Sequence, residues 1–156
     1  VVDLGADKIW RYRVTTTSDG KNQIEKIGSA DTPLGWGPRH MAIKNNTAYV
    51  IFELETRIGV YQIDPLMGNL KFVSALPTVS GKCNLTTVHY TRYMSHYIIL
   101  LNFIAAIDGK PQYGAEIAVH PNGKWLYVSN RGHGPLCVYH IDENAGDNLT
   151  LHQVLV

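Results

Sequence analysis

The stretch Trp125-Leu126-Tyr127-Val128-Ser129-Asn130-Arg131-Gly132 decides the predicted fold, because its frame of residues recurs twice upstream. The run Tyr49-Val50-Ile51-Phe52-Glu53 has the same pattern, and the chain's first residues, Val1-Val2-Asp3-Leu4, show it again. Each run is strand-like, since apolar β-branched and aromatic residues dominate it. Three residues therefore hold one equivalent position in three copies: Leu4, Glu53 and Arg131.

Each copy is predicted to form short antiparallel strands joined by turns, because apolar runs alternate with turn residues such as Asn, Gly and Pro. In the second copy the expected strands are 41–43, 48–52, 57–63 and 70–76. In the third copy they are 115–120, 125–130, 136–141 and 149–156. A four-stranded repeat of about 50 residues is typical of a β-propeller blade, since such a sheet must stack on its neighbours to bury both faces.

The predicted fold is therefore all-β, a β-propeller of four-stranded antiparallel blades with about three blades' worth of the ring in this chain. Propellers close with roughly four to eight blades. The chain begins at Val1 and ends at Val156 within strand-like runs. We therefore expect residues 1–156 to be one partial propeller domain, a fragment of a longer protein.

One segment departs from the repeat. Glu53 and Arg131 lie much further apart than one repeat, and the excess falls near residues 85–107. This atypical insertion lacks the alternation and the turn residues of the rest of the chain. A helical excursion, a long loop packed on the sheets and a mis-spliced insertion all remain open.

Composition excludes several classes of partner. The chain has 156 residues, of which 45% are hydrophobic and 17% charged, and its formal net charge is +1. No basic tract favours nucleic acid or an anionic membrane surface. The longest apolar run, residues 97–107, is broken by Asn102 and is too short to cross a bilayer. We expect a cytoplasmic protein with no nucleic-acid or membrane partner.

Four residues are candidates for a site at the mouth of the propeller channel. Arg39 and His40 follow a Gly-Pro turn at the entry to a blade, whereas Glu53 and Arg131 directly follow strands. Two arginines offer forked donors that match a carboxylate or phosphate. A carboxylate beside them can accept a proton or orient a water molecule. The combination suits a small anionic substrate whose bond is opened or closed by proton transfer, although a purely structural ion pair between Glu53 and Arg131 is the alternative.

Two further features of the titratable residues are informative. Glu116 lies at the position equivalent to His40, so it is expected either to face the same channel or to serve a structural hydrogen bond. The other histidines show no metal-ligand spacing. We therefore expect neither a metal ion nor another cofactor.

Several motifs, taken together, resemble the lactonase family of seven-bladed β-propellers. The family includes the cycloisomerase-type 6-phosphogluconolactonases and the fungal 3-carboxy-cis,cis-muconate lactonizing enzyme. The motifs occur in the family's order outside residues 85–107. They are Val1-Val2-Asp3-Leu4-Gly5-Ala6-Asp7, Gly37-Pro38-Arg39-His40, Phe52-Glu53-Leu54, Ala115-Glu116-Ile117 and Leu126-Tyr127-Val128-Ser129-Asn130-Arg131-Gly132.

The resemblance implies a channel-mouth site made of Arg39, Glu53 and Arg131, with His40 as a supporting donor to the substrate. The family also uses a histidine from a blade that precedes the residues present here. This chain departs from the family at Phe52, where an asparagine is usual.

The resemblance and the residues lead to three functional expectations. The first is hydrolysis of a sugar-acid lactone such as 6-phosphogluconolactone. The second is the opposite chemistry within the family, cyclisation of 3-carboxy-cis,cis-muconate to its lactone. The third, from another class, is a non-catalytic propeller that serves as a binding platform.

Overall fold

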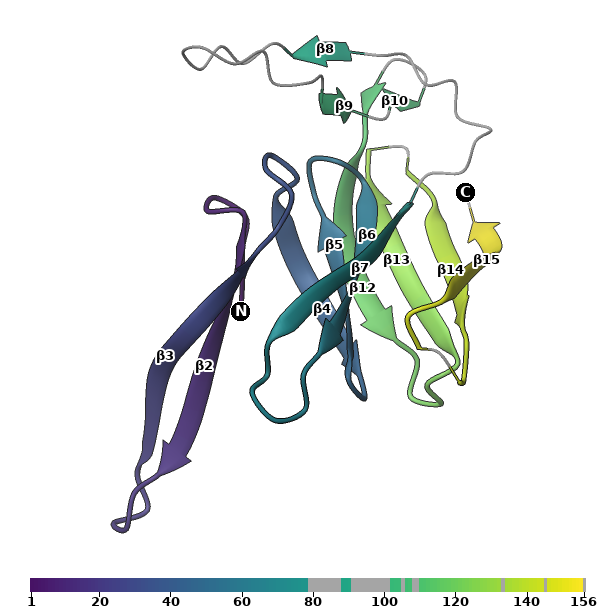
Figure 1. Ribbon diagram of the computed structural model, residues 1–156. Coiled ribbons are helices and arrows are strands. Elements are labelled where there is room, and N and C mark those ends of the chain that lie inside the picture. The colour runs from purple at the N-terminus through teal and green to yellow at the C-terminus, as the bar shows by residue number, and fades with distance from the viewer. Residues whose placement is uncertain are drawn as a thin grey trace.

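The computed structural model describes residues 1–78, 88–90, 102–104, 106–107, 110–132, 134–144 and 146–155. All the regular secondary structure in these ranges consists of β-strands. The strands form three larger antiparallel sheets that stand side by side, as Figure 1 shows. This arrangement confirms the predicted all-β blades.

The three larger sheets follow one another along the chain. The first contains β1 (Val2–Asp3), β2 (Lys8–Thr16) and β3 (Asn22–Asp31). The second contains β4 (Pro38–Lys44), β5 (Thr47–Phe52), β6 (Arg57–Ile63) and β7 (Leu70–Pro77). The third contains β12 (Tyr113–Val119), β13 (Trp125–Arg131), β14 (Leu136–Ile141) and β15 (Leu149–Leu155).

Four shorter strands lie between the second and third sheets in the chain and pair as two small ladders. They are β8 (Val88–Tyr90), β9 (Asn102–Ile104), β10 (Ala106–Ile107) and β11 (Lys110–Pro111). The atypical insertion predicted near residues 85–107 falls largely outside the described residues, which include only β8, β9 and β10 there. Its nature stays a prediction.

The side chains of β5 explain why the sheets stack. All six residues of this strand are buried, and successive side chains point to opposite faces of the sheet. Ala48, Val50 and Phe52 pack in one cluster with Ile9 of the first sheet. Tyr49 and Ile51 enter the other cluster, which includes residues of all four strands of the third sheet. A strand that is apolar on both faces requires a neighbouring sheet on each side.

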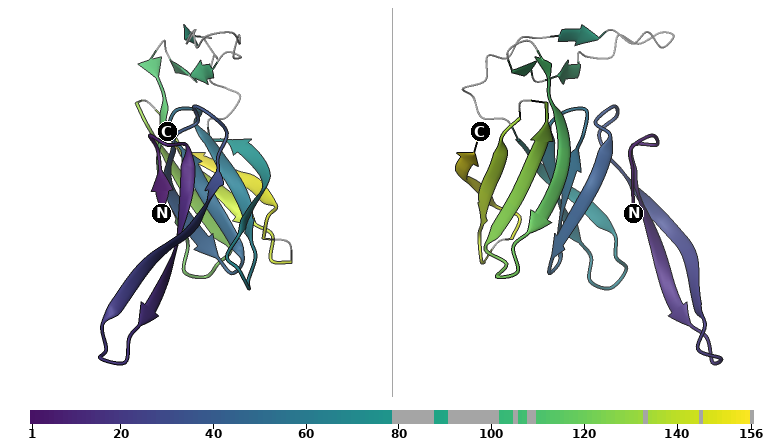
Figure 2. Two further views of the ribbon diagram at one scale, coloured as in Figure 1. Left: turned by 60° about the vertical axis from the view of Figure 1, so that its left-hand side comes forward. Right: turned by 180° about the vertical axis from the view of Figure 1, so that it is seen from behind.

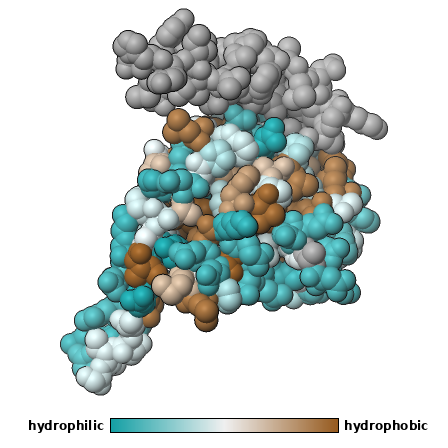
Figure 3. All heavy atoms as spheres, in the orientation of Figure 1, coloured by the Kyte–Doolittle hydropathy of each residue, from teal (hydrophilic) through white to brown (hydrophobic). Residues whose placement is uncertain are grey.

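The β2–β3 hairpin extends well beyond the other sheets, which is plain in both views of Figure 2. Its projecting tip is hydrophilic in Figure 3, in keeping with the Thr, Ser, Asp and Lys residues of its turn. Within the described residues, no helix is long and apolar enough to cross a membrane.

Candidate active site

A hydrogen-bonded loop positions the beginning of β4. The Asp7 carboxylate, from the turn between β1 and β2, accepts hydrogen bonds from the backbone N–H groups of Gly35 (2.7 Å) and Gly37 (2.9 Å). Gly37 has a φ of 62°, and a Cβ there would lie 3.1 Å from Leu54 Cγ. The Gly37 carbonyl accepts a hydrogen bond from the Glu53 N–H at 2.8 Å. One loop thus joins the start of β4 to the residue that follows β5.

Arg39 occupies a β-bulge. Pro38 pairs with Phe52 and His40 pairs with Ile51, so Arg39 is the extra residue of β4. Bulges of this kind redirect a side chain at the end of a strand. The strand expected at 41–43 begins at Pro38 instead, so Pro38, Arg39 and His40 belong to β4. The strand begins earlier because proline tolerates the first position of a strand and the bulge restores pairing after it.

Both arginines contact the Glu53 carboxylate. Arg39 Nη1 donates to Glu53 Oε2 at 2.7 Å, and Arg131 Nη2 forms an ion pair with the other oxygen, Oε1. The Glu53 side chain is 17% exposed, while those of Arg39 and Arg131 are 34% and 46% exposed. Two guanidinium groups face one carboxylate, so this Arg39–Glu53–Arg131 cluster keeps a net positive charge. Such a site attracts an anion.

The third sheet approaches the cluster through a glycine. The Gly114 N–H of β12 donates to the Glu53 carbonyl at 2.9 Å. A Cβ on Gly114 would lie only 2.4 Å from the Phe52 carbonyl oxygen, a distance that no side chain tolerates. The absence of a side chain at Gly114 therefore lets the second and third sheets meet where Glu53 and Arg131 come together.

Asn130, which precedes Arg131, hydrogen-bonds to the second sheet. Its side-chain amide donates to the Thr78 carbonyl at 3.1 Å, and the buried Thr78 hydroxyl donates to its side-chain oxygen at 2.6 Å. Thr78 follows β7, so these bonds tie the second sheet to the strand that ends at Arg131. The register places Phe52 at the position equivalent to Asn130. Phe52 packs edge-to-face on Trp36, with ring centroids 5.1 Å apart.

His40 faces a different carboxylate, that of Glu116. Its Nδ1 is 3.9 Å from Glu116 Oε1 on β12, and both side chains are largely accessible, at 44% and 63% exposed. The ladder gives these two residues equivalent places, because Met41 pairs with Val50 and Ile117 pairs with Val128. The predicted correspondence between His40 and Glu116 is therefore present in the strand register.

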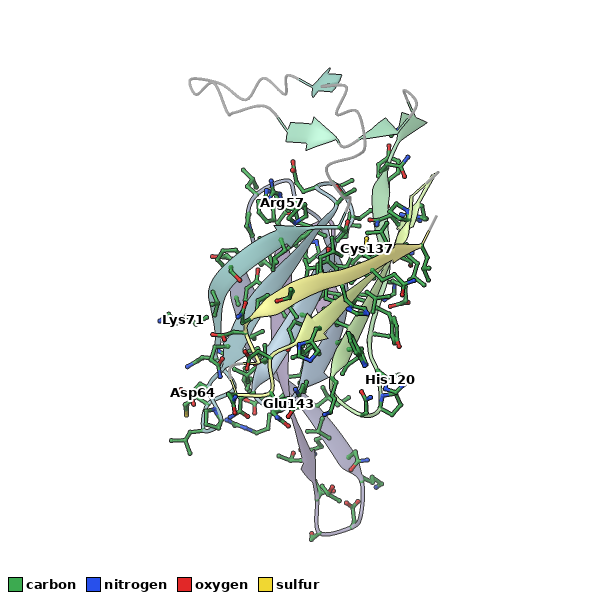
Figure 4. All side chains as sticks on the ribbon, turned by 90° about the vertical axis from the view of Figure 1, so that its right-hand side faces the viewer. Arg57, Asp64, Lys71, His120, Cys137 and Glu143 are labelled. Carbon is green, nitrogen blue, oxygen red and sulfur yellow. The ribbon has the colours of Figure 1, made fainter. Side chains whose placement is uncertain are left out.

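The turn after Glu53 carries another carboxylate that sequence analysis did not select. Burial raises the pKa of the Glu55 carboxyl, and the Arg57 guanidinium opposes part of that rise. Arg57 lies at the upper ends of the strands in Figure 4. Asp7, Thr78 and Gly114 were likewise given no role. The two arginines could be found from sequence because they lie in the motifs Gly-Pro-Arg-His and Ser-Asn-Arg-Gly. The supporting contacts join segments that are distant in sequence, so no local motif indicates them.

The strands' opposite ends contain a separate cavity of about 310 Å³. Lys44, Gln62, Glu143 and Asp147 contribute to its lining, and none of the cluster's residues does. Figure 4 shows Glu143 far from Arg57, at the other end of the strands. Among the described residues, no group of three or more His, Cys, Asp or Glu side chains is placed to hold a metal ion. The ion-pair cluster is therefore the candidate site.

A known protein family matches nearly the whole chain. The sequence model described as "Lactonase, 7-bladed beta-propeller" matches residues 1–155. The chain belongs to this lactonase family. This match confirms the predicted propeller, which has seven blades in the complete family fold. It also confirms the resemblance to the lactonase family.

Individual lactonase-family relatives are similar over nearly the whole chain. A 6-phosphogluconolactonase of Pectobacterium atrosepticum is 30% identical over 95% of this chain and 37% of its own length. A 6-phosphogluconolactonase of Bacillus subtilis is 28% identical over 94% of this chain and 34% of its own length. The chain thus spans about a third of the length of these curated relatives.

Solved structures agree with the lactonase fold. A crystal structure of a Lactobacillus plantarum protein superposes with a TM-score of 0.71 at 26% identity, covering 99% of this chain and 37% of that one. The periplasmic gluconolactonase PpgL of Pseudomonas aeruginosa superposes with a TM-score of 0.69 at 20% identity, covering 98% and 36%. The second similarity shows the fold alone.

Proposed function

We propose that the whole protein hydrolyses a sugar-acid lactone of the 6-phosphogluconolactone type. The observation that carries this proposal is the contact of both Arg39 and Arg131 with the Glu53 carboxylate. Relatives named 6-phosphogluconolactonase support the choice of reaction. In this proposal the three residues are catalytic, and His40 contacts the substrate.

The proposed reaction opens the lactone ring with water. Glu53 accepts a proton from a water molecule, whose oxygen attacks the lactone carbonyl carbon. A guanidinium donates to the carbonyl oxygen as negative charge develops on it. The bond between this carbon and the ring oxygen then breaks, and the ring oxygen takes up the proton. The product is the open-chain hydroxy acid, with every atom of water accounted for.

The cluster's charge also suits the anionic part of such a substrate. Each guanidinium has five N–H donors, more than the Glu53 carboxylate engages. Arg39 Nε, which is buried, has no hydrogen-bond partner among the described residues. In this proposal the exposed donors of Arg39 and Arg131 that Glu53 does not engage bind a phosphate or the developing oxyanion.

The test is a substitution of Glu53 in the whole protein. Glu53→Gln keeps the size of the side chain but removes its ability to accept a proton at neutral pH. We expect kcat for 6-phosphogluconolactone to fall by about 100-fold or more, the usual contribution of a general base. Turnover is measured as acid release in a weakly buffered indicator assay, corrected for spontaneous hydrolysis.

Glu25→Gln is the matched control, since the Glu25 side chain is exposed and pairs with Arg13 on the β2–β3 hairpin. It is expected to retain full activity. An active Glu53→Gln protein would overturn the role of this carboxylate. Turnover of 3-carboxy-cis,cis-muconate without lactone hydrolysis would instead support cyclisation, and an inactive wild-type protein that still binds these anions would support the binding platform.

A further inference from the structure

The residues His40 and Glu116 form a pair that the proposed hydrolysis does not explain. They come from β4 and β12, the strands through which the second and third sheets lie against each other. Each occupies the same register position in its own sheet. The first strand of each blade lines the axial channel of a propeller. The pair therefore lies on the wall beside the cluster, with His40 directly following Arg39 in the chain.

The distance between the two groups leaves a place for a ligand. His40 Nδ1 and Glu116 Oε1 are 3.9 Å apart, which is too long for a hydrogen bond. A hydroxyl group whose oxygen lies about 2.8 Å from both atoms would donate a hydrogen bond to Glu116 Oε1 and accept one from the His40 Nδ1–H. The two side chains are 44% and 63% exposed, so such a hydroxyl group can reach them.

Glu116 is held in position by its own strand. Its Oε1 accepts a hydrogen bond from the Ile117 N–H at 2.9 Å, and its N–H donates to Ser129 Oγ at 3.1 Å. An anchored carboxylate loses less freedom when it binds a ligand. As an acceptor-only group it favours hydroxyl donors and repels carboxylates.

We propose that His40 and Glu116 form a subsite that binds the hydroxyl groups of a polyhydroxylated substrate and disfavours polycarboxylates. This inference rests on the proposed function and deepens it. The Arg39–Glu53–Arg131 cluster takes the anionic and reacting groups, while the subsite recognises the sugar part. Glu116 thereby distinguishes a sugar-acid lactone from a muconate, which has several carboxylates and no hydroxyl.

Equilibrium binding tests the subsite without requiring turnover. The probes are 6-phosphogluconate and 6-phosphonooxyhexanoate, which have the same terminal charges and chain length but differ in their hydroxyl groups. Isothermal titration calorimetry on the whole wild-type protein is expected to give about tenfold tighter binding of 6-phosphogluconate, because hydrogen bonds to a charged group are among the stronger ones. Glu116→Ala and His40→Ala should each bring the ratio of the two Kd values close to one.

A second measurement isolates the charge. Glu116→Gln keeps the shape of the side chain, and it should bind propane-1,2,3-tricarboxylate about threefold more tightly than the wild type, since a like charge has been removed. Glu25→Gln should change neither measurement. Circular dichroism of each variant confirms that the fold is retained.

The outcomes separate this inference from the proposed function. The subsite would be overturned if the wild-type protein bound neither probe or showed no preference for 6-phosphogluconate. A preference that survived in both alanine variants would overturn it as well. Lactone turnover alongside such a result would leave the proposed function intact. Conversely, selective binding that depends on Glu116, with no turnover of lactone, would uphold the subsite and contradict the hydrolase.

Discussion

Equivalent residue positions in neighbouring blades carry different chemistry. Where the second sheet has Glu53, the third has Arg131, and the two meet as an ion pair. Where the second has His40, the third has Glu116. By the same register Arg39 corresponds to Ala115, so the bulge presents a guanidinium in one sheet and a methyl group in the next. The same strand arrangement thus holds different polar side chains at equivalent positions of the two sheets.

The role of Asp7 depends on contacts with residues that are distant in sequence. Asp7→Asn should destabilise the fold by about 2 kcal/mol, because two backbone N–H groups lose a charged acceptor. It should also lower kcat, since the loop that it holds leads directly to Arg39. Urea unfolding and lactone turnover measure the two effects.

Asp31→Asn provides the comparison for Asp7, because the Asp31 side chain is 79% exposed and forms a surface ion pair with Lys8. It should change stability by less than about 0.5 kcal/mol. Equal losses of unfolding free energy in the two variants would show that the Asp7 hydrogen bonds to Gly35 and Gly37 stabilise the fold no more than a surface ion pair does.

At the scale of elements, the contacts between sheets determine how one sheet stacks on the next. β5 is buried on both faces, and the backbone of β12 hydrogen-bonds to the residue that follows β5 through Gly114. Tyr139 of β14 donates to the Pro77 carbonyl at 2.6 Å. Through such contacts each sheet fixes the position of its neighbour, as in other stacked repeats.

Gly114→Ala tests this close approach. The new methyl group would lie 2.4 Å from the Phe52 carbonyl oxygen, so the two sheets must move apart. We expect a loss of about 2–3 kcal/mol in the free energy of unfolding, together with reduced lactone turnover because Glu53 and Arg131 separate. The change is measured by the midpoint of urea unfolding.

Gly5→Ala is the control for Gly114, since the nearest atom to a Cβ at Gly5 is 3.8 Å away. It should leave both the midpoint and the turnover nearly unchanged. A stable and active Gly114→Ala protein would mean that the interface between β12 and β5 can relax around an added methyl group.

At the scale of the whole molecule, the cores between sheets contain tyrosines whose hydroxyl groups resist ionisation. Burial raises the pKa of Tyr49 to about 12 and raises the pKa values of Tyr61 and Tyr139 as well. In the unfolded chain a tyrosine ionises near pH 10. Above that pH the unfolded state loses protons that the native state keeps. The free energy of unfolding must therefore fall as the pH rises.

The Tyr139→Phe variant separates the effect of tyrosine ionisation on the free energy of unfolding from the loss of a hydrogen bond. At pH 8 the variant should be less stable than the wild type, because the Pro77 carbonyl loses its donor. Between about pH 10 and 11.5 the gap should narrow, since phenylalanine has no proton to lose in either state. Urea unfolding at each pH measures the gap, and a gap that stays constant contradicts the argument.

Sequence alone predicted the all-β class, the repeated sheets, the family and the charged residues of the candidate site. Local patterns carry this information, because alternation along a strand and a short motif are both contained within a few neighbouring residues. The catalytic roles of Arg39, Glu53 and Arg131, the substrate contact of His40 and the cytoplasmic location stay predictions.

Only the tertiary structure decided how the charged residues are held. The bulge at Arg39, the clamp of Asp7 on the loop before it, the close approach at Gly114 and the bonds from Asn130 to Thr78 all depend on the register and stacking of the sheets. These contacts join residues far apart in the chain, so no local pattern encodes them. The sequence therefore determines which groups can act, and the packing of one sheet on the next determines that Glu53 lies between two guanidinium groups.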